Sequence, residues 1–119
     1  MKKKTVLIAL VALIAGFSAL YAQSNANLKS GVYRYSGIHG AAMVIIQGAS
    51  SPTVKKITVR GVSGEVLMRG TAIINGTRVN VDYGNDGFET WTIVNNETFT
   101  DDNYEKTWRW VRNYTNDEL

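Results

Sequence analysis

The chain has 119 residues, a net charge of +3 and no cysteine. The missing cysteines exclude a disulfide scaffold and a lipid-anchored bacterial lipoprotein. The positive excess lies in Lys2, Lys3 and Lys4, because the rest of the chain has ten basic and ten acidic residues. Balanced charge in that larger part argues against nucleic acid as a partner.

Residues 1–22 have the pattern of a signal peptide. The three lysines are followed by an uncharged apolar stretch from Thr5 to about Tyr21, and Ala22 supplies the small residue expected at a cleavage point. The alternative is a membrane anchor, but the apolar stretch is near the short end of the ~17–25 residues that a span needs. We therefore expect an exported protein, periplasmic or secreted, that is not membrane-spanning after signal removal.

The remaining chain is long enough for one domain. We expect a flexible lead-in at 23–30, a β-barrel domain at 31–113 and a polar tail at 114–119. Between 31 and 113 the chain reads as short apolar or alternating runs separated by turn residues, and Asn75-Gly76 is the strongest hairpin signal among them. The predicted strands are Gly31–Tyr35, Ala41–Gln47, Val54–Arg60, Glu65–Ile74, Thr77–Tyr83, Phe88–Val94, Glu97–Asp101 and Lys106–Asn113.

Alternation along these runs predicts which side chains face the core. Val79, Val81 and Tyr83 fall on one face of their strand, whereas Arg78 and Asp82 fall on the other. The fold class is therefore all-β, a single small antiparallel meander of about eight strands in a closed or nearly closed barrel. A two-sheet sandwich is the alternative. A transmembrane barrel fits less well, because its strands need ~9–11 residues with an apolar outer face.

Two ends of the barrel domain resemble the lipocalin-like barrels, in particular small exported bacterial ones. Those families carry Gly-x-Trp on the first strand, and a basic residue of the last strand packs over that ring. Here Gly31-Val32-Tyr33 begins the first strand, with tyrosine in place of tryptophan, and Arg109 and Arg112 lie in the last. The resemblance implies a barrel in which an arginine stacks on an aromatic ring. The chain is shorter than a typical lipocalin, so a filled interior without a ligand cavity stays open.

Aromatic residues are the strongest functional signal. The chain has three tryptophans, at 91, 108 and 110. Most aromatic rings of so small a domain must lie in the core. We expect Trp108 and Trp110 to point inward near Tyr33; the opposite register would expose both as a surface patch. The predicted ligand-binding residues are Tyr33, Tyr35, Trp91, Trp108, Trp110, Arg109 and Arg112.

No set of residues indicates catalysis or a metal. His39, the only histidine, lies in a glycine-flanked loop where an exposed side chain is expected. Asp101, Asp102 and Glu105 have the composition of a turn and lack the spacing of a calcium loop. Glu89 with either Asp101 or Glu105 offers an acid–base pair, but the sequence does not fix their separation. We expect no enzyme activity, no cofactor and no bound metal.

Two functions fit this pattern. The first is an exported, non-catalytic binding module that holds an apolar or aromatic small ligand in the barrel. The second is a surface protein–protein interaction domain with a filled core, acting as an inhibitor, adhesin or envelope component on an envelope or extracellular protein. It is suggested by the charge distribution, since residues 23–80 carry a net +6 and residues 81–119 a net −6.

Overall fold

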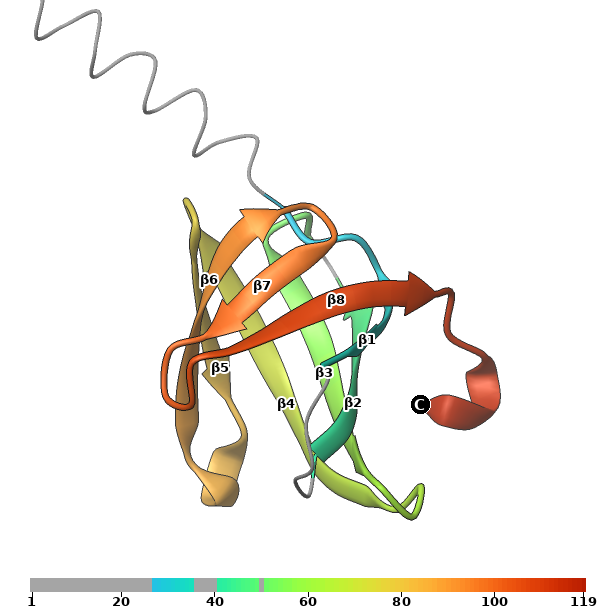
Figure 1. Cartoon of the computed structure of the whole chain (residues 1–119). Helices are drawn as coiled ribbons and strands as arrows, with labels where there is room; N and C mark the ends of the chain where they lie inside the picture. Colours follow the sequence, from blue (N-terminus) through green and yellow to red (C-terminus); the bar gives the residue numbers. More distant parts are fainter. Residues whose placement is uncertain (1–26, 36–40, 50) are drawn as a thin grey trace, which may run out of the picture.

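The computed structural model describes residues 27–35, 41–49 and 51–119. The predicted signal peptide 1–22, residues 23–26 of the lead-in and the loop that holds His39 lie outside the described residues. The described chain forms eight strands and two short 3-10 turns (Figure 1). They are β1 (Gly31–Arg34), β2 (Ala41–Gly48), β3 (Val54–Gly61), β4 (Val66–Asn75), β5 (Arg78–Asp82), η1 (Gly84–Asp86), β6 (Phe88–Asn95), β7 (Thr98–Asp101), β8 (Lys106–Arg112) and η2 (Asn116–Glu118).

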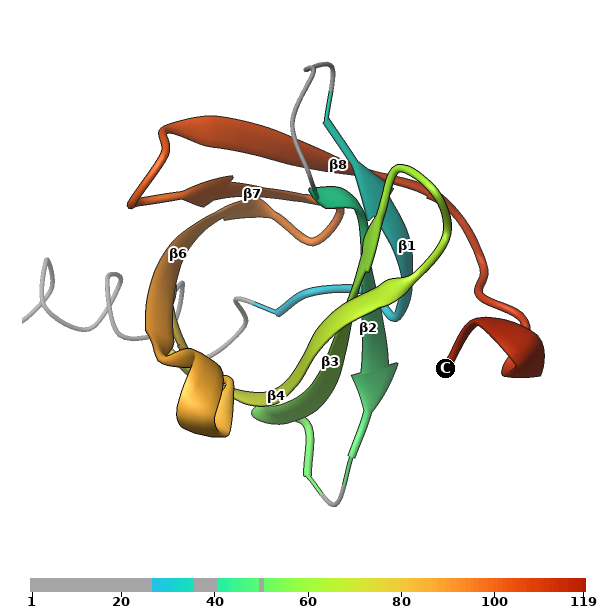
Figure 2. The same cartoon turned by 90° about the horizontal axis from the view of Figure 1, so that it is seen from below.

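The strands pair in chain order and close into a barrel, which Figure 2 shows from one end. Every neighbouring pair is antiparallel, and β1 also pairs with β8, where Tyr33 is the register partner of Trp110. Asn75 and Gly76 form the β4–β5 hairpin, with Gly76 at the positive φ of 65° that this turn requires. The predicted meander is confirmed as a closed barrel, so the sandwich alternative is wrong.

Alternation places the apolar side chains of the core inside. On β5, Val79 and Val81 are buried whereas Arg78, Asn80 and Asp82 are exposed. Each strand contributes to a single core. The buried core comprises Leu28, Tyr33, Val44, Ile46, Ile57, Val59, Ala72, Ile74, Val79, Val81, Tyr83, Trp91, Ile93, Phe99 and Trp108.

One end of the barrel is covered by the segment that precedes β1. The side chain of Leu28 is buried in the core. Lys29 donates its backbone N–H to the carbonyl of Asn96 in the β6–β7 turn, at 2.7 Å. The Tyr33 hydroxyl donates to the carbonyl of Lys29, at 2.6 Å. An apolar side chain and hydrogen bonds thus attach residues 27–30 of the predicted lead-in to the barrel.

Trp110, on the last strand, contacts this covering segment. Its indole Nε1 donates to the carbonyl of Ser30 at 3.1 Å, and the Lys29 ammonium lies 3.6 Å from its ring centroid. Trp108 and Trp110 both pack on the core side, as predicted. The predicted arginine over an aromatic ring is not observed: Arg109 is exposed and Arg112 pairs with Glu118. Among the described residues, lysines make the cation–π contacts instead: Lys29 of the lead-in over Trp110 and Lys106 of β8 over Tyr35.

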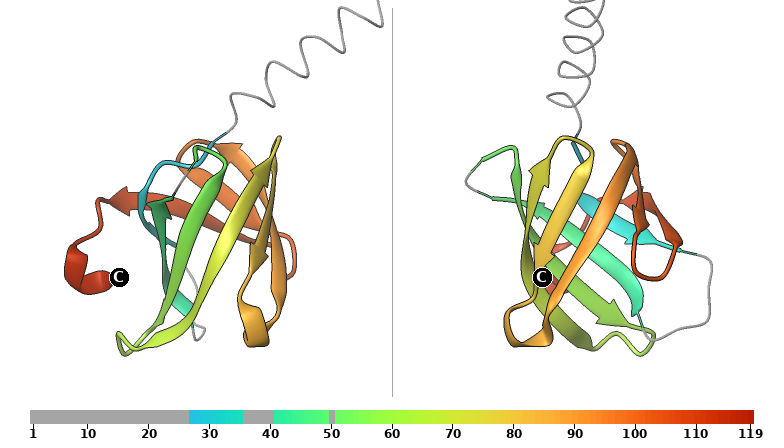
Figure 3. Two further views of the ribbon diagram at one scale, coloured as in Figure 1. Left: turned by 180° about the vertical axis from the view of Figure 1, so that it is seen from behind. Right: turned by 90° about the vertical axis from the view of Figure 1, so that its left-hand side faces the viewer.

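The polar tail lies against the outside of the barrel, beside the green strands in Figure 3. Arg60 donates to the carbonyl of Glu118 at 2.9 Å, and Arg69 donates to the backbone oxygen of Leu119 at 3.0 Å. Arg112 binds both carboxylate oxygens of Glu118 at 2.7 Å. This pairing lowers the pKa of Glu118 to about 2. Three arginines from β3, β4 and β8 thus hold the tail in place.

Candidate functional site

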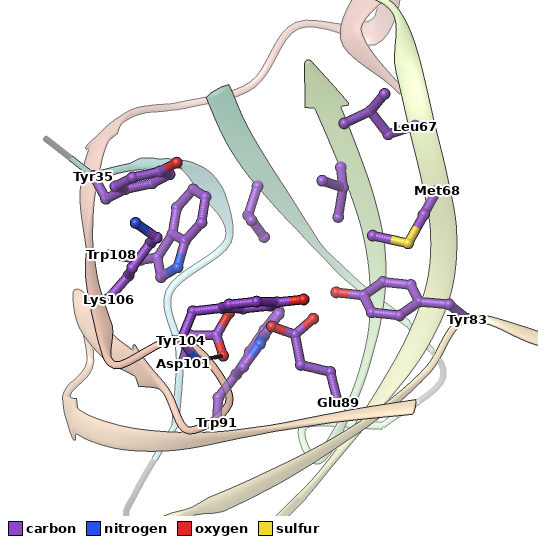
Figure 4. A pocket seen from close by; sticks show the side chains of 12 residues that line it. Tyr35, Leu67, Met68, Tyr83, Glu89, Trp91, Asp101, Tyr104, Lys106 and Trp108 are labelled. Carbon is purple, nitrogen blue, oxygen red and sulfur yellow. Dashed lines mark hydrogen bonds between the residues drawn. The ribbon is translucent and has the colours of Figure 1, made fainter. Parts of the chain in front are cut away.

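A cavity of about 550 Å³ opens at the end of the barrel opposite Leu28 (Figure 4). This end carries the β3–β4, β5–β6 and β7–β8 turns. The volume is within the range of small-molecule binding sites, about 300–1,000 Å³. The lining residues come from six of the strands and from the segments that follow β1, β5 and β7: Tyr35, Val44, Val59, Leu67, Met68, Tyr83, Glu89, Trp91, Asp101, Tyr104, Lys106 and Trp108.

Aromatic rings form one side of the cavity. The rings of Tyr35 and Trp108 meet edge to face with centroids 4.4 Å apart. Behind them Phe99 stacks on Trp91 at 4.1 Å and lies parallel to Trp108 at 6.1 Å. Rings held on several neighbours have little freedom to rearrange, so the wall is preformed for a flat apolar group.

Two carboxyl groups stand against this apolar lining. Asp101 ends β7 directly across from Trp91, and Glu89 precedes Trp91 by two positions, so both side chains face inward. Tyr83 also lines the cavity beside this pair. Asp101 Oδ1 accepts the backbone N–H of Asn103 at 2.8 Å.

Burial and the neighbouring carboxyl determine how this pair titrates. Burial, together with the hydrogen bond and negative charge of Asp101, raises the pKa of Glu89 to about 7. Burial also raises the pKa of Tyr83 far above its usual value, and the charge of Glu89 adds to that shift. At neutral pH the Tyr83 hydroxyl is therefore protonated and able to donate. Glu89, whose pKa is about 7, is protonated in about half of the molecules at that pH.

We expect the carboxyl pair to make the protein less stable as the pH rises. A glutamate in the unfolded chain titrates near ~4.3, whereas Glu89 in the fold titrates at about 7. Between these values the folded state binds more protons, so the free energy of unfolding falls as pH increases. Glu89→Gln removes this titration and should raise the stability at pH 8 relative to wild type by roughly 1 kcal/mol, with much less gain at pH 4, allowing for partial solvent screening.

Thermal unfolding of both proteins at pH 4, 6 and 8 checks this expectation. Glu65→Gln, which changes an exposed glutamate in the β3–β4 turn, is the matched control and should follow wild type throughout. Parallel curves for wild type and Glu89→Gln between pH 4 and 8 would show that Glu89 does not titrate in this range.

The rim of the cavity carries one cation. Lys106 begins β8 directly across from Asp101, and its Nζ lies 4.8 Å from the Tyr35 ring centroid. Within the described part of the chain, Lys106 makes no ion pair. Tyr104, in the β7–β8 turn, is exposed and overhangs the opening (Figure 4). Among the described residues that line the cavity, the charged groups are thus two carboxyls inside and one ammonium at the edge.

Of the predicted ligand-binding residues, three line the cavity and four do not. Tyr35, Trp91 and Trp108 form its aromatic wall. Tyr33 and Trp110 lie at the covered end with the lead-in. Arg109 and Arg112 lie on the outer surface. The fold therefore separates the predicted set into the wall of the cavity, the covered end and the outside of the barrel.

The polar residues of the cavity were not in the predicted set. Glu89 lies on the same face of its strand as Trp91 and Ile93, and Asp101 lies on the same face as Phe99. Alternation along the strands was therefore the signal that would have placed both carboxyl groups inside the barrel. Asp101 also performs its expected turn function, accepting the N–H groups of Asn103 and Tyr104. A turn residue at the end of a strand can thus face the interior as well.

The acidic residues considered for hydrolysis or for a metal are divided between the cavity and its surroundings. Glu89 and Asp101 both line the cavity. Glu105, the other candidate partner, is exposed in the β7–β8 turn. Among the residues that the structure describes, no three histidine, cysteine or acidic side chains converge on a common point where a metal ion would fit.

Comparison with protein-family models, with curated proteins and with solved structures found no match. The closed antiparallel barrel of eight strands is compatible with a lipocalin-like fold. Within residues 27–35, 41–49 and 51–119, no helix has the length and apolar character needed to cross a membrane.

Proposed function

We propose that this protein is an exported, non-catalytic binding module of the lipocalin-like kind, which holds a small apolar or aromatic ligand in the open end of its barrel. The cavity of about 550 Å³ with its aromatic wall is the observation that carries the proposal. Export rests on the signal-peptide pattern of residues 1–22. The ligand enters between the turns at that end and places its apolar body against Trp91 and Trp108.

The exposed apolar residues support ligand entry at this end. Leu67 and Tyr104 line the cavity and are also 42% and 71% exposed. Both side chains therefore reach from the solvent to the interior, and they provide an apolar path for a ligand. At the other end Leu28 occupies the core, so a ligand has one route in and out.

The alternative function, a surface interaction domain with a filled core, has less support. It assumes an interior packed by side chains, whereas the barrel contains a cavity large enough for a small molecule. The charge division between residues 23–80 and 81–119 remains its main argument.

We expect the purified protein to bind a neutral fluorescent probe such as N-phenyl-1-naphthylamine at micromolar concentration. The probe gains fluorescence when its rings leave water, so a titration gives the affinity directly. Met68→Trp enlarges a side chain that lines the cavity and should weaken binding at least about tenfold, since overfilling a cavity forces out its occupant.

Ile73→Trp is the matched control. Ile73 lies on the same strand but is 54% exposed on the outer face, so this variant should bind the probe like wild type. Two outcomes contradict the proposal: no probe bound at micromolar concentration, or equal loss of binding in both variants.

A further inference from the structure

The charged groups inside the cavity are carboxyls. Glu89 and Asp101 both line it, and Lys106 lies at the rim over Tyr35. The neutral polar groups of the lining are tyrosine hydroxyls and indole N–H groups. A ligand that reaches the carboxyl pair therefore gains most if it donates hydrogen bonds.

We infer that the ligand is an aromatic or apolar amine in its protonated form, bound with its ammonium group at Glu89 and Asp101 and its apolar body against the rings of Trp91, Trp108 and Tyr35. The inference rests on the proposed function and specifies the ligand class of that same site. An ammonium carries three donors and one positive charge, which matches two adjacent carboxyl groups.

The burial of the carboxyl pair gives this recognition its selectivity. Asp101 is only 4% exposed. Placing a second anion beside buried carboxyls would bring like charges together in a medium of low dielectric, so a carboxylate ligand is disfavoured at this point. A neutral apolar ligand would place carbon atoms against the carboxyl groups. It would form none of the hydrogen bonds that an ammonium group forms with them.

The aromatic wall favours the same class of ligand. A cation close to tryptophan or tyrosine rings is attracted by their π electrons, most strongly where water is excluded. Trp91 is the register partner of Asp101 and stacks on Phe99 at 4.1 Å, so its ring is held beside the carboxyl pair. The apolar part of an amine and its charge thus find adjacent partners on one wall.

Proton balance makes the binding pH-dependent. The groups that face Glu89 are Asp101 on β7, Tyr83 after β5, Trp91 on β6 and, at the rim, Lys106 on β8. Below about pH 7 the carboxyl pair holds a proton, which the incoming ammonium must displace into solvent. Affinity for the amine should therefore fall by up to about tenfold per pH unit below 7.

Three probes with one ring system test the inference: 2-naphthylmethylammonium, 2-naphthylmethanol and 2-naphthoate, each titrated into the purified protein by calorimetry at pH 8 and pH 5.5. We expect the amine to bind at least about tenfold tighter than the alcohol at pH 8, and to lose most of that advantage at pH 5.5. The alcohol should change little, and the carboxylate should bind weakest.

Variants assign the effect to the carboxyl pair. Glu89→Gln should abolish the preference for the amine and its pH dependence while the alcohol still binds, and Glu65→Gln, on the exposed β3–β4 turn, should behave as wild type. Equal or tighter binding of the alcohol or the carboxylate in the wild-type protein at pH 8 overturns the inference and leaves the proposed function standing. If none of the three probes binds, both fail. An amine preference that survives Glu89→Gln also overturns the assignment.

Discussion

Replacing Phe99 with alanine should lower the free energy of unfolding by about 3–5 kcal/mol. Phe99 is fully buried and lies at the centre of the aromatic cluster, with ring centroids 5.3 Å from Tyr33 and 4.1 Å from Trp91. Truncation removes both contacts and leaves a hole between rings that are themselves held by other neighbours. Since a domain of this size has a total stability of ~5–15 kcal/mol, this loss is a large part of the total, and the variant should unfold at a clearly lower urea concentration than wild type.

Phe88→Ala is the matched control. It deletes the same side chain where it is 78% exposed, so the change in stability should stay within about 0.5 kcal/mol. Urea unfolding of both variants followed by tryptophan fluorescence measures the difference. If the two variants unfold at similar urea concentrations, Phe99 does not lie in the packed core that the barrel requires.

Gly31→Ala should destabilise the protein by about 2–4 kcal/mol, because two costs add. Gly31 adopts a φ of +149°, which side chains of L-residues rarely tolerate. An added Cβ would also meet the Trp110 indole Nε1, and it would lie 2.7 Å from the carbonyl oxygen of Arg112. The indole would have to move, and its hydrogen bond to Ser30 would be lost.

Gly48→Ala, on the neighbouring strand, separates this effect from the general cost of changing a glycine. A Cβ at Gly48 finds its nearest neighbour at 3.8 Å, an ordinary contact, so this variant should unfold within a few degrees of wild type. Thermal unfolding followed by circular dichroism compares the two. Equal melting temperatures would mean that Trp110 does not lie across Gly31.

The barrel strands could be predicted from the sequence because the signals that specify them lie within short stretches of the chain. Val79, Val81 and Tyr83 alternate with polar residues, and Asn75-Gly76 fixes the hairpin before them. Each antiparallel neighbour is then determined by a short turn. Closure did not follow from that pattern, which also allowed a two-sheet sandwich, because it depends on the pairing of β1 with β8 at opposite ends of the chain.

The functional site could be predicted only in part. Tyr35, Trp91 and Trp108 were identified as binding residues because large rings dominate small interiors. Glu89 and Asp101 were considered for catalysis, and Asp101 also for a calcium site or a turn, but neither was placed among the binding residues, since a carboxyl group in a strand is usually on the solvent side. Their proximity depends on the β6–β7 register, in which Trp91 pairs with Asp101, and that register shifts at a bulge that no local pattern reveals.

Contacts between the two ends of the chain were the least predictable. Lys29 stacks on Trp110, 81 positions away in sequence, where an arginine of the last strand was expected. On the outside, Val32 and Ile45 are neighbours on adjacent strands and are fully buried. They are not part of the inner core, and the tail lies on that side of the barrel. From composition alone, residues 23–30 were expected to form a flexible lead-in and residues 114–119 a polar tail.

The central claim is that a ligand enters the open end of the barrel. The three tryptophans provide the most direct measurement, because each indole N–H gives its own signal in a nitrogen–proton correlation spectrum. Trp91 and Trp108 line the cavity, whereas Trp110 lies at the covered end, bonded to Ser30. Titration with 2-naphthylmethanol, the neutral probe, should shift the signals of Trp91 and Trp108 and leave that of Trp110 in place. A shift of Trp110 alone, or of none of the three, would contradict the account.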